Sequence, residues 1–358
     1  MWYRIQNTTE LLTPCLLFYP ARIQQNIERM IAMAGQVERL RPHVKTYKCK
    51  EVVEMQVAAG IHKFKCATLA EAEMLASVGG LDVLIAYPLV GAAQQGFLNL
   101  KAQYPSTNFS VLVDHRDQVA QWGSRLGASD ILSVYIDVNV GMNRTGLEPD
   151  RVLELCQMLS ASLSLKGLHI YDGHIHQNGL TDREQAVQKA FQPIAEIAST
   201  LKESGELELV CGGSISFPIH AQYPDRGLSP GTTLLWDRGY QQQFPDLPFS
   251  IAAAVATQVV SKPRTNHICL DLGYKAVAAE MKTMPVHFPQ LPNAKLITHS
   301  EEHLVIESSL ADKYGIGDIL YALPWHICPT VAMYDKAIII EQGKIFDAWQ
   351  ITARRRYS

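Results

Sequence analysis

The sequence lacks a long hydrophobic run, an excess of basic charge and a set of pairable cysteines. No apolar segment approaches the roughly 18 to 20 residues that span a bilayer, and residues 1–5 carry no signal-peptide pattern. The net charge of −3 gives no basic field for a nucleic-acid backbone. The seven cysteines are an odd number scattered along 358 residues, which does not form a disulfide framework. We therefore expect a cytoplasmic protein whose partners include neither a membrane nor nucleic acid.

The composition is that of a globular protein with room for two domains. Hydrophobic residues make up 47% of the chain and charged residues 19%, which excludes a disordered or collagen-like chain. Because a domain typically has roughly 100 to 200 residues, the length of 358 residues suggests two domains, one of them a large barrel.

Residues 14–211 alternate between apolar, extended segments and segments with helical spacing. Strands are predicted at residues 14–19, 38–46, 63–68, 82–87, 109–114, 133–138, 167–171 and 207–211. Helices are predicted at residues 21–34, 51–59, 69–78, 92–103, 116–126, 149–160 and 182–203. Strands without strict polar alternation indicate a parallel sheet covered on both faces, and eight such units favour a closed (β/α)8 barrel. An open nucleotide-binding sheet is the alternative, but no G-x-G-x-x-G follows the first strand.

The pattern changes near Trp236, after which short β-rich segments separated by Pro, Asn and Gly indicate an antiparallel β domain. Its strands are predicted at residues 252–261, 267–272, 294–298, 303–308 and 336–341. We therefore expect a barrel domain at residues 14–235 and a β domain at residues 236–358, with residues 1–13 joining the second domain.

In a barrel of this kind, catalytic groups project from the carboxyl ends of the strands. Lys45 ends the second predicted strand, and its cationic neighbours Arg41, Lys48 and Lys50 would lower its pKa toward that of a nucleophilic amine. The alternative is an ordinary basic surface loop. Arg144 follows the sixth predicted strand and Tyr171 ends the seventh.

Glycine turns follow the eighth predicted strand. Gly212, Gly213 and Ser214 form one turn, and the run Ser229-Pro230-Gly231-Thr232 forms a second, so that both together can hold a phosphate. Each turn alone is also an ordinary loop sequence. A phosphorylated pyridine aldehyde needs this phosphate site, an amine for an imine, a cation near its phenolate oxygen and a flat side chain for stacking. Lys45, Arg144 and Tyr171 would supply the last three.

The segment 323–330 contains His326 and Cys328 between Pro324 and Pro329. The prolines predict an extended segment, in which residues two apart point the same way, so that the imidazole and the thiol can bind one metal ion. The alternative is a buried histidine and cysteine in a β domain. His174 and His176 form a similar pair, for which we favour hydrogen-bonding or structural roles.

Taken together, these motifs resemble the D-threonine aldolase and D-serine dehydratase family, whose members bind pyridoxal 5'-phosphate on an alanine-racemase-like barrel (PLP fold type III) followed by a β domain. The resemblance covers nearly the whole chain. It rests on residues 41–46, 143–146, 171–174, 229–232, 271–276 and 324–330.

The resemblance implies a role for each matching position. Lys45 would form the imine, Arg144 would contact the phenolic oxygen, and Tyr171 would stack on the pyridine ring. His326 and Cys328 would hold a divalent metal, and His326 would be catalytic. A thiolate ligand favours zinc over manganese, and manganese or magnesium are the alternatives. The phosphate would lie at Gly212, Gly213, Ser214, Gly231 and Thr232. Family members usually have histidine where this chain has Tyr47, so no role is assigned to that side chain.

The implied activity is that of a lyase on D-β-hydroxy-amino acids, in a homodimeric protein. We expect retro-aldol cleavage of D-threonine-type substrates to glycine and an aldehyde. The alternative is dehydration of D-serine or D-3-hydroxyaspartate to a keto acid and ammonia, because in this family a His-x-Asp pair is typical of the aldolases and His-x-Cys of the dehydratases. A racemase has no need of the metal pair, and a non-catalytic cofactor-binding protein has no need of the β domain, so both are less favoured.

Overall fold

The computed structural model describes residues 1–127, 129–203, 205–281 and 283–355. Contacts between residues divide the chain into two compact units. One contains residues 1–29, 46–52 and 232–354, and the other contains residues 30–45, 53–231 and 355–358. The first unit thus takes in more of the N-terminal region than the predicted residues 1–13, and the predicted boundary near Trp236 stays a prediction.

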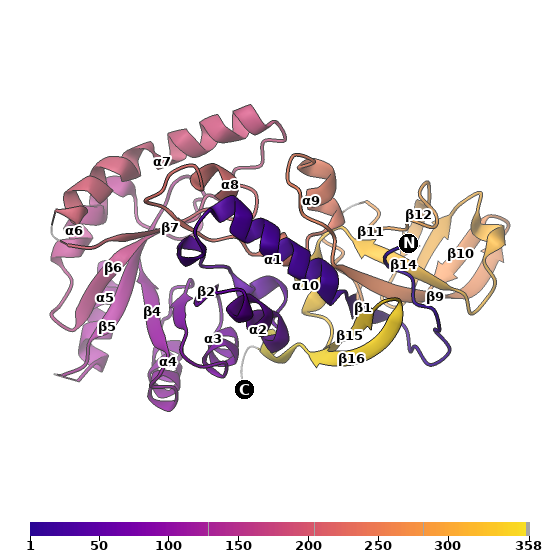
Figure 1. Ribbon diagram of the computed structural model, residues 1–358, viewed down its shortest axis with the longest axis horizontal. Helices are drawn as coiled ribbons and strands as arrows, with labels where there is room; N and C mark the ends of the chain where they lie inside the picture. Colours follow the sequence, from indigo (N-terminus) through magenta and orange to yellow (C-terminus); the bar gives the residue numbers. More distant parts are fainter. Residues whose placement is uncertain (128, 204, 282, 356–358) are drawn as a thin grey trace. The chain divides into compact units, whose positions relative to one another are not determined.

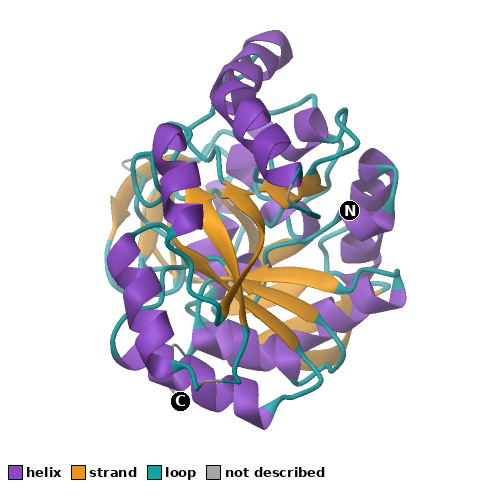
Figure 2. Ribbon diagram, turned by 90° about the vertical axis from the view of Figure 1, so that its left-hand side faces the viewer, coloured by secondary structure: helices purple, strands orange, loops and turns teal. Residues whose placement is uncertain are grey.

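The second unit is built on a parallel sheet, which has seven strands within the described residues, in the order β2-β3-β4-β5-β6-β7-β8. The strands are β2 (Lys63–Cys66), β3 (Asp82–Ile85), β4 (Asn108–Val113), β5 (Leu132–Val138), β6 (Leu163–Ile170), β7 (Glu208–Cys211) and β8 (Gly227–Leu228). Figure 2 shows the strands fanning out from a centre, with helices on the outside. Strand interiors are almost wholly buried, as expected for a sheet covered on both faces.

Helices alternate with these strands along the chain, close to their predicted positions (Figure 1). They are α1 (Pro20–Ala34), α2 (Lys50–Ala58), α3 (Leu69–Ala76), α4 (Ala92–Gln103), α5 (Arg116–Arg125), α6 (Val152–Gln157), α7 (Leu180–Lys202) and α8 (Phe217–His220). Local signals fix some of their ends. The hydroxyl of Thr68, for example, accepts a hydrogen bond from the amide of Glu71 and begins α3.

The eighth position of the barrel is filled by residues 40–43 rather than by a regular strand. Leu40 makes a parallel bridge to Leu228 in β8, and His43 makes one to Lys65 in β2. These bridges join the two ends of the sheet and close the ring of strands. The strand predicted at residues 38–46 is therefore wrong in part, because short 3-10 turns lie at Val37–Arg39 and Val44–Thr46, and Pro42 lacks the N–H that a continuous ladder requires.

The strand predicted at residues 14–19 forms as β1 (Cys15–Phe18), but its assignment to the barrel is wrong. It pairs antiparallel with β9 (Ala253–Arg264) and parallel with β15 (Lys336–Glu341) in the sheet of the first unit. A buried apolar strand carries no local signal for its partner, so the sequence alone could not place it.

The first unit contains a mainly antiparallel sheet, which has nine strands in the part of the chain that is described. Its central order is β12-β13-β10-β9-β1-β15-β16, and β14 pairs with β9 and β11. The remaining strands are β10 (His267–Leu270), β11 (Val286–His287), β12 (Lys295–His299), β13 (Leu304–Glu307), β14 (Ile319–Pro324) and β16 (Lys344–Gln350). Two short helices, α9 (Arg238–Gln243) and α10 (Ile327–Val331), complete the unit. Strands β11, β14 and β16 were not predicted from the sequence.

Candidate functional site

Tyr171, directly after β6, is the aromatic centre of a group of cations at the carboxyl end of the barrel. The Nζ atoms of Lys45 and Lys65 each lie 5.7 Å from the centroid of its ring, and the Arg144 guanidinium carbon lies 5.1 Å from it. These distances are within the range of cation–π attraction. The structure therefore brings the predicted Lys45, Arg144 and Tyr171 together, and adds Lys65.

Lys45 lies in the 3-10 turn that follows the bridging segment 40–43. It is half-buried, and its backbone N–H donates to Nδ1 of His43 at 3.2 Å. Arg41, predicted as a cationic neighbour, points instead to the amino end of the barrel, where it pairs with Asp82 at 2.6 Å and Glu208 at 3.0 Å. Lys65 instead lies near enough to Lys45 to be affected by its charge: burial, followed by the charge of Lys45, lowers the pKa of Lys65 to about 7.

Three buried polar side chains, Lys65, His169 and Asp137, form a hydrogen-bonded chain near Tyr171, which we call the relay. It was not predicted from the sequence. Nε2 of His169 lies 3.3 Å from Nζ of Lys65, and its Nδ1 lies 2.6 Å from Oδ1 of Asp137. Burial opposes the charge of Asp137, but His169 and the Thr145 hydroxyl hold the pKa of this carboxyl below its ordinary value. Burial and the charge of Lys65 lower the pKa of His169. The imidazole of His169 thus lies between a carboxylate and an amine.

A signal for this relay was present in the sequence. His169 and Tyr171 are two residues apart and so share one face of the chain, while Asp137 is the register partner of His169 on β5. Lys65 interrupts an otherwise apolar part of the short strand β2. Polar residues at inward positions of buried strands would have pointed to the relay, but only after the strand register was known.

The predicted phosphate turns are tightly packed. Gly212 has φ +75°, and a Cβ on Gly213 would lie 3.2 Å from the Tyr171 ring. The amide of Gly212 donates to the carbonyl of Ile170 at 2.9 Å. The amides of Gly213 and Gly231 donate to the hydroxyls of Ser216 and Ser214, at 2.9 and 3.1 Å. The glycines thus leave space beside the tyrosine, while their amides are already hydrogen-bonded within the protein.

A second buried network supports the Gly212–Gly213 turn. Asp172 accepts hydrogen bonds from the Ser216 hydroxyl at 2.6 Å and from Nε2 of His220 at 2.9 Å. Nδ1 of His220 accepts in turn from Arg226 at 3.0 Å. Burial opposes the charge of Asp172, but His220 and Ser216 lower its pKa. This network fixes the turn next to Tyr171, and sequence reasoning did not find it.

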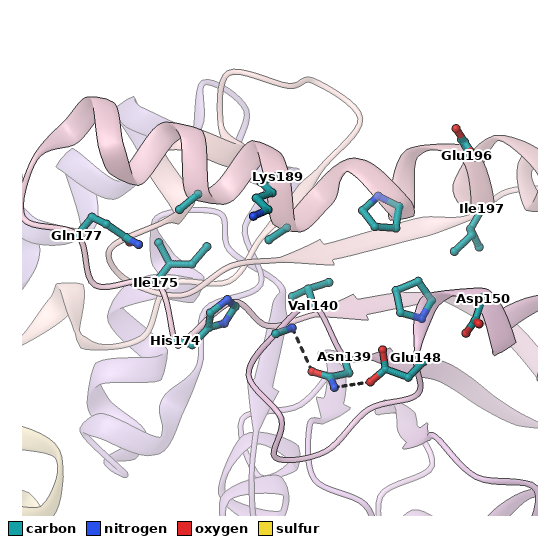
Figure 3. A pocket seen from close by; sticks show the side chains of 15 residues that line it. Asn139, Val140, Glu148, Asp150, His174, Ile175, Gln177, Lys189, Glu196 and Ile197 are labelled. Atoms are coloured by element: carbon teal, nitrogen blue, oxygen red, sulfur yellow. Dashed lines mark hydrogen bonds between the residues drawn. The ribbon is translucent and has the colours of Figure 1, made fainter.

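The loop that carries Arg144 borders a pocket of about 810 Å³ (Figure 3). Asn139 holds the loop by donating to Glu148 at 2.8 Å and accepting from the amide of Gly141 at 3.1 Å. A Cβ on Gly141 would lie 2.8 Å from Nε2 of His174, so the imidazole packs directly on the loop. This contact agrees with the structural role that we favoured for His174, which stays a prediction, as does that of the exposed His176.

The first unit contains the predicted metal pair. The prediction of an extended segment is wrong from Ile327 onward, because Cys328 lies in the first turn of α10 and His326 precedes that helix. The two side chains nevertheless contact each other through a hydrogen bond. The Cys328 sulfur also lies 3.2 Å from the Thr46 hydroxyl and 3.5 Å from that of Thr232.

The charges around His326 and Cys328 favour a thiolate on Cys328 and a protonated imidazole on His326. Burial opposes the thiolate, but the contact with His326 lowers the pKa of Cys328. Burial also opposes the imidazolium, yet Cys328 and Glu280 raise the pKa of His326 to about 9. Glu280 contacts Nδ1 of His326, and both side chains are nearly half exposed. Within the described residues, no group of three or more His, Cys, Asp or Glu side chains is arranged to hold a metal ion.

Comparisons with known proteins place the chain in a family. The profile of the alanine racemase N-terminal domain matches residues 20–234, and that of a putative serine dehydratase domain matches residues 252–340. The first match covers more than half of the chain, which therefore belongs to this family. The resemblance inferred from the motifs is confirmed, as is the predicted alanine-racemase-like fold with a second, mainly antiparallel domain.

Three individual proteins illustrate the similarity. D-threonine aldolase of an Arthrobacter species is 30% identical, over 96% of this chain and 92% of that protein. The crystal structure of D-threonine aldolase from Filomicrobium marinum has a TM-score of 0.86 at 26% identity and covers 96% of both chains. D-threo-3-hydroxyaspartate dehydratase of Delftia sp. (strain HT23) is 24% identical, over 90% of this chain and 92% of that protein. Both lyase types of the sequence analysis are thus represented. Among the described residues, no helix is long and apolar enough to cross a bilayer.

Proposed function

We propose that the protein is a pyridoxal-phosphate-dependent lyase that cleaves D-threonine-type substrates to glycine and an aldehyde. The observation that carries the proposal is the convergence of Lys45, Lys65 and Arg144 on the ring of Tyr171, each within 6 Å of its centroid. The similarity to D-threonine aldolase over nearly the whole chain supports the substrate class.

The residues around Tyr171 fit pyridoxal phosphate. Its ring offers a stacking face that the absent Cβ of Gly213 leaves open, Lys45 offers the amine for a covalent bond, and Arg144 offers a cation for the phenolate oxygen. When bound, the cofactor supplies an electron-withdrawing ring that stabilises negative charge at Cα of the substrate. The proposed phosphate contacts are Gly212, Gly213, Ser214, Gly231 and Thr232. Because the glycine amides already have acceptors, hydroxyl groups would supply much of the binding.

His326 and Cys328 fit a divalent metal that retains open positions, because they offer two ligands and a catalytic metal must also bind water or substrate. When bound, the metal supplies a Lewis acid for the β-hydroxyl oxygen. The lowered pKa of Cys328 supports a thiolate ligand and therefore zinc, with manganese or magnesium as the alternatives. Because Glu280 contacts Nδ1 of His326, Nε2 would be the ring nitrogen that binds the metal, in place of the hydrogen bond between His326 and Cys328.

A dehydratase acting on D-serine or D-3-hydroxyaspartate is the second candidate function. The observation that favours it is Cys328, since His-x-Cys is the pair that we associate with the dehydratases of this family. In that reaction Lys45 would remove the α-proton, and the products would be a keto acid and ammonia.

Product analysis tests the proposal directly. The purified protein, supplied with pyridoxal phosphate and zinc, is given D-threonine and D-serine, with the L-enantiomers as controls. Glycine and acetaldehyde from D-threonine would support the aldolase, and ammonia with a keto acid would support the dehydratase. Formation of the mirror-image amino acid as the main product would instead make the protein a racemase. Unchanged turnover after complete metal removal would overturn the metal assignment. The homodimer and the cytoplasmic location stay predictions.

A further inference from the structure

Asp237 is a buried carboxylate to which the proposed function gives no task. Its residue is 3% exposed, and it lies directly before α9. One carboxylate oxygen, Oδ1, accepts a hydrogen bond from the amide of Tyr240 at 2.9 Å and so caps that helix. The other, Oδ2, accepts from the amide of Ile327 at 3.1 Å. Because Ile327 stands between His326 and Cys328, one side chain joins the start of α9 to the peptide between the two proposed metal ligands.

The same turn contacts the ligand segment at a second point. The amide of Gly239 donates to the carbonyl of Trp325 at 3.0 Å. A Cβ on Gly239 would lie 2.6 Å from that carbonyl oxygen, so this close approach requires glycine. Trp325 precedes His326 and Ile327 follows it. The two contacts therefore fix the backbone on both sides of His326, and with it the direction in which the imidazole leaves the chain.

The backbone directly before Asp237 is strained. Trp236 has φ +47°, in the left-handed region, where a bulky side chain is a genuine outlier. Its indole is fully buried, with ring centroids 5.1 Å from Tyr240 and 5.3 Å from Phe249. Its amide donates to the carbonyl of Thr232 at 2.7 Å. Strain of this kind persists only where the surrounding structure holds it, and it is concentrated at functional sites. The residue that follows this strained backbone is the one whose carboxylate meets the ligand segment.

We infer that Asp237 is a positioning residue, which holds the peptide between His326 and Cys328 in a conformation that lets the imidazole and the thiol reach one metal ion. The two side chains already contact each other through a hydrogen bond. Ligands that are oriented beforehand lose less conformational freedom on binding. Asp237 itself would contact neither metal nor substrate. The inference rests on the proposed function, because it concerns the same metal pair.

The test compares the zinc affinity of full-length variants loaded with pyridoxal phosphate, by competition with a chromogenic chelator. Asp237→Ala loses both acceptor oxygens and should bind zinc about 10-fold more weakly, as is usual for the loss of a supporting contact at a metal site. Asp237→Ser keeps a hydroxyl at the start of α9, where serine caps as well as aspartate, but has no second oxygen for Ile327. It should bind zinc as weakly as Asp237→Ala. Wild-type affinity in Asp237→Ser would overturn the inference, because capping alone would then explain the residue.

Thr68→Ala is the matched control. It removes the cap of α3, in which the Thr68 hydroxyl accepts from the amide of Glu71 at 3.2 Å, and it lies in the other unit. The unfolding midpoint should fall as it does for a lost cap, while zinc affinity stays at the wild-type value. A similar loss of zinc affinity in Thr68→Ala would contradict the inference, because general destabilisation would then be the cause.

Cobalt(II) in place of zinc gives a spectroscopic readout that a purely structural role would not change. A cysteine thiolate bound to cobalt(II) produces a charge-transfer absorption band. Per bound metal, this band should be weaker in Asp237→Ala and Asp237→Ser than in the wild type and Thr68→Ala, because the thiol and the imidazole are no longer held toward one position. Equal bands in all four proteins would speak against the positioning role.

Hydrogen exchange on the unmutated protein covers the case in which the Asp237 variants do not fold. In the metal-free protein, the amide of Ile327 should already exchange slowly, and zinc should change its rate little. Fast exchange that becomes slow only with zinc would overturn the inference, because the metal rather than Asp237 would then organise the segment. If the wild type binds no zinc at all, the metal assignment of the proposed function fails, which is a different result.

Discussion

Arg41 and Lys65 are both buried cations of the barrel, at 0% and 2% exposure, but they lie at its opposite ends. Arg41 pairs with two carboxylates, Asp82 and Glu208, at the starts of their strands. Lys65 lies near the carboxyl ends and, among the described residues, has no carboxylate within ion-pair distance. Burial opposes both charges, but the neighbours of Arg41 raise its pKa above the ordinary value, whereas that of Lys65 is lowered to about 7.

The difference shows how one barrel separates stability from chemistry. A buried cation with direct carboxylate partners stays charged and ties strands together. A buried amine that reaches a carboxylate only through an imidazole can change its charge, as acid–base work requires. This agrees with the general division of such barrels, in which the amino end stabilises and the carboxyl end reacts.

The largest expected effect is that of Lys45→Ala at the carboxyl end. Loss of the nucleophile should lower kcat/KM by roughly 10³-fold or more and abolish borohydride-trapped cofactor, while the unfolding midpoint stays close to that of the wild type. The matched control is Lys63→Ala at the amino end. A trapped adduct that persists in Lys45→Ala would move the assignment to another lysine.

Arg41→Met should show the opposite pattern. It leaves Asp82 and Glu208 without their shared partner, so the free energy of unfolding should fall by about 3 kcal/mol, measured by urea titration. Activity per folded molecule should remain, because the guanidinium points away from Lys45. Loss of activity at unchanged stability would contradict the view that the amino end of the barrel serves stability and the carboxyl end serves chemistry.

Glu280→Gln extends the comparison to the metal pair, where a carboxylate contacts a proposed ligand. If Glu280 orients His326, its loss should weaken zinc binding by about 10- to 100-fold, measured by competition with a chromogenic chelator. The control is Glu302→Gln, which removes only the exposed pairing with Lys275 at 3.0 Å. Equal zinc affinity in the two variants would mean that the Glu280 contact does not support the metal.

The smallest effect is expected for Tyr135→Phe at the amino end. The Tyr135 hydroxyl donates to Glu208 at 2.6 Å and accepts from Arg41 at 3.3 Å. Its removal should cost about 1 kcal/mol of stability, seen as a lowered unfolding midpoint, with kcat/KM unchanged. If Tyr135→Phe lowered the free energy of unfolding by more than Arg41→Met does, the hydroxyl rather than the ion pairs would be the main stabilising contact of this network.

Much of the fold could be predicted because periodicity is a local property. The helices at residues 92–103 and 116–126, for example, match α4 and α5 within one residue. Strand pairing is not local, and for that reason β1 was assigned to the wrong sheet. The bridging segment 40–43 was predicted as a strand because it is extended, although in the described part of the chain it pairs with its neighbours through two isolated bridges and forms no regular strand.

The residues of the candidate site also fall into two groups, those that local motifs identified and those that only the tertiary structure showed. Lys45, Arg144, Tyr171, His326 and Cys328 could be singled out because they belong to contiguous motifs that resemble a known family. The sequence by itself thus determined the family, the alternation of elements and the candidate nucleophile. Only the tertiary structure decided that Arg41 turns away from Lys45, that Lys65 takes its place, and that Asp137 and His169 stand behind it. The physical reason is that burial and strand register set which charges meet, and both arise from contacts between residues far apart in the chain.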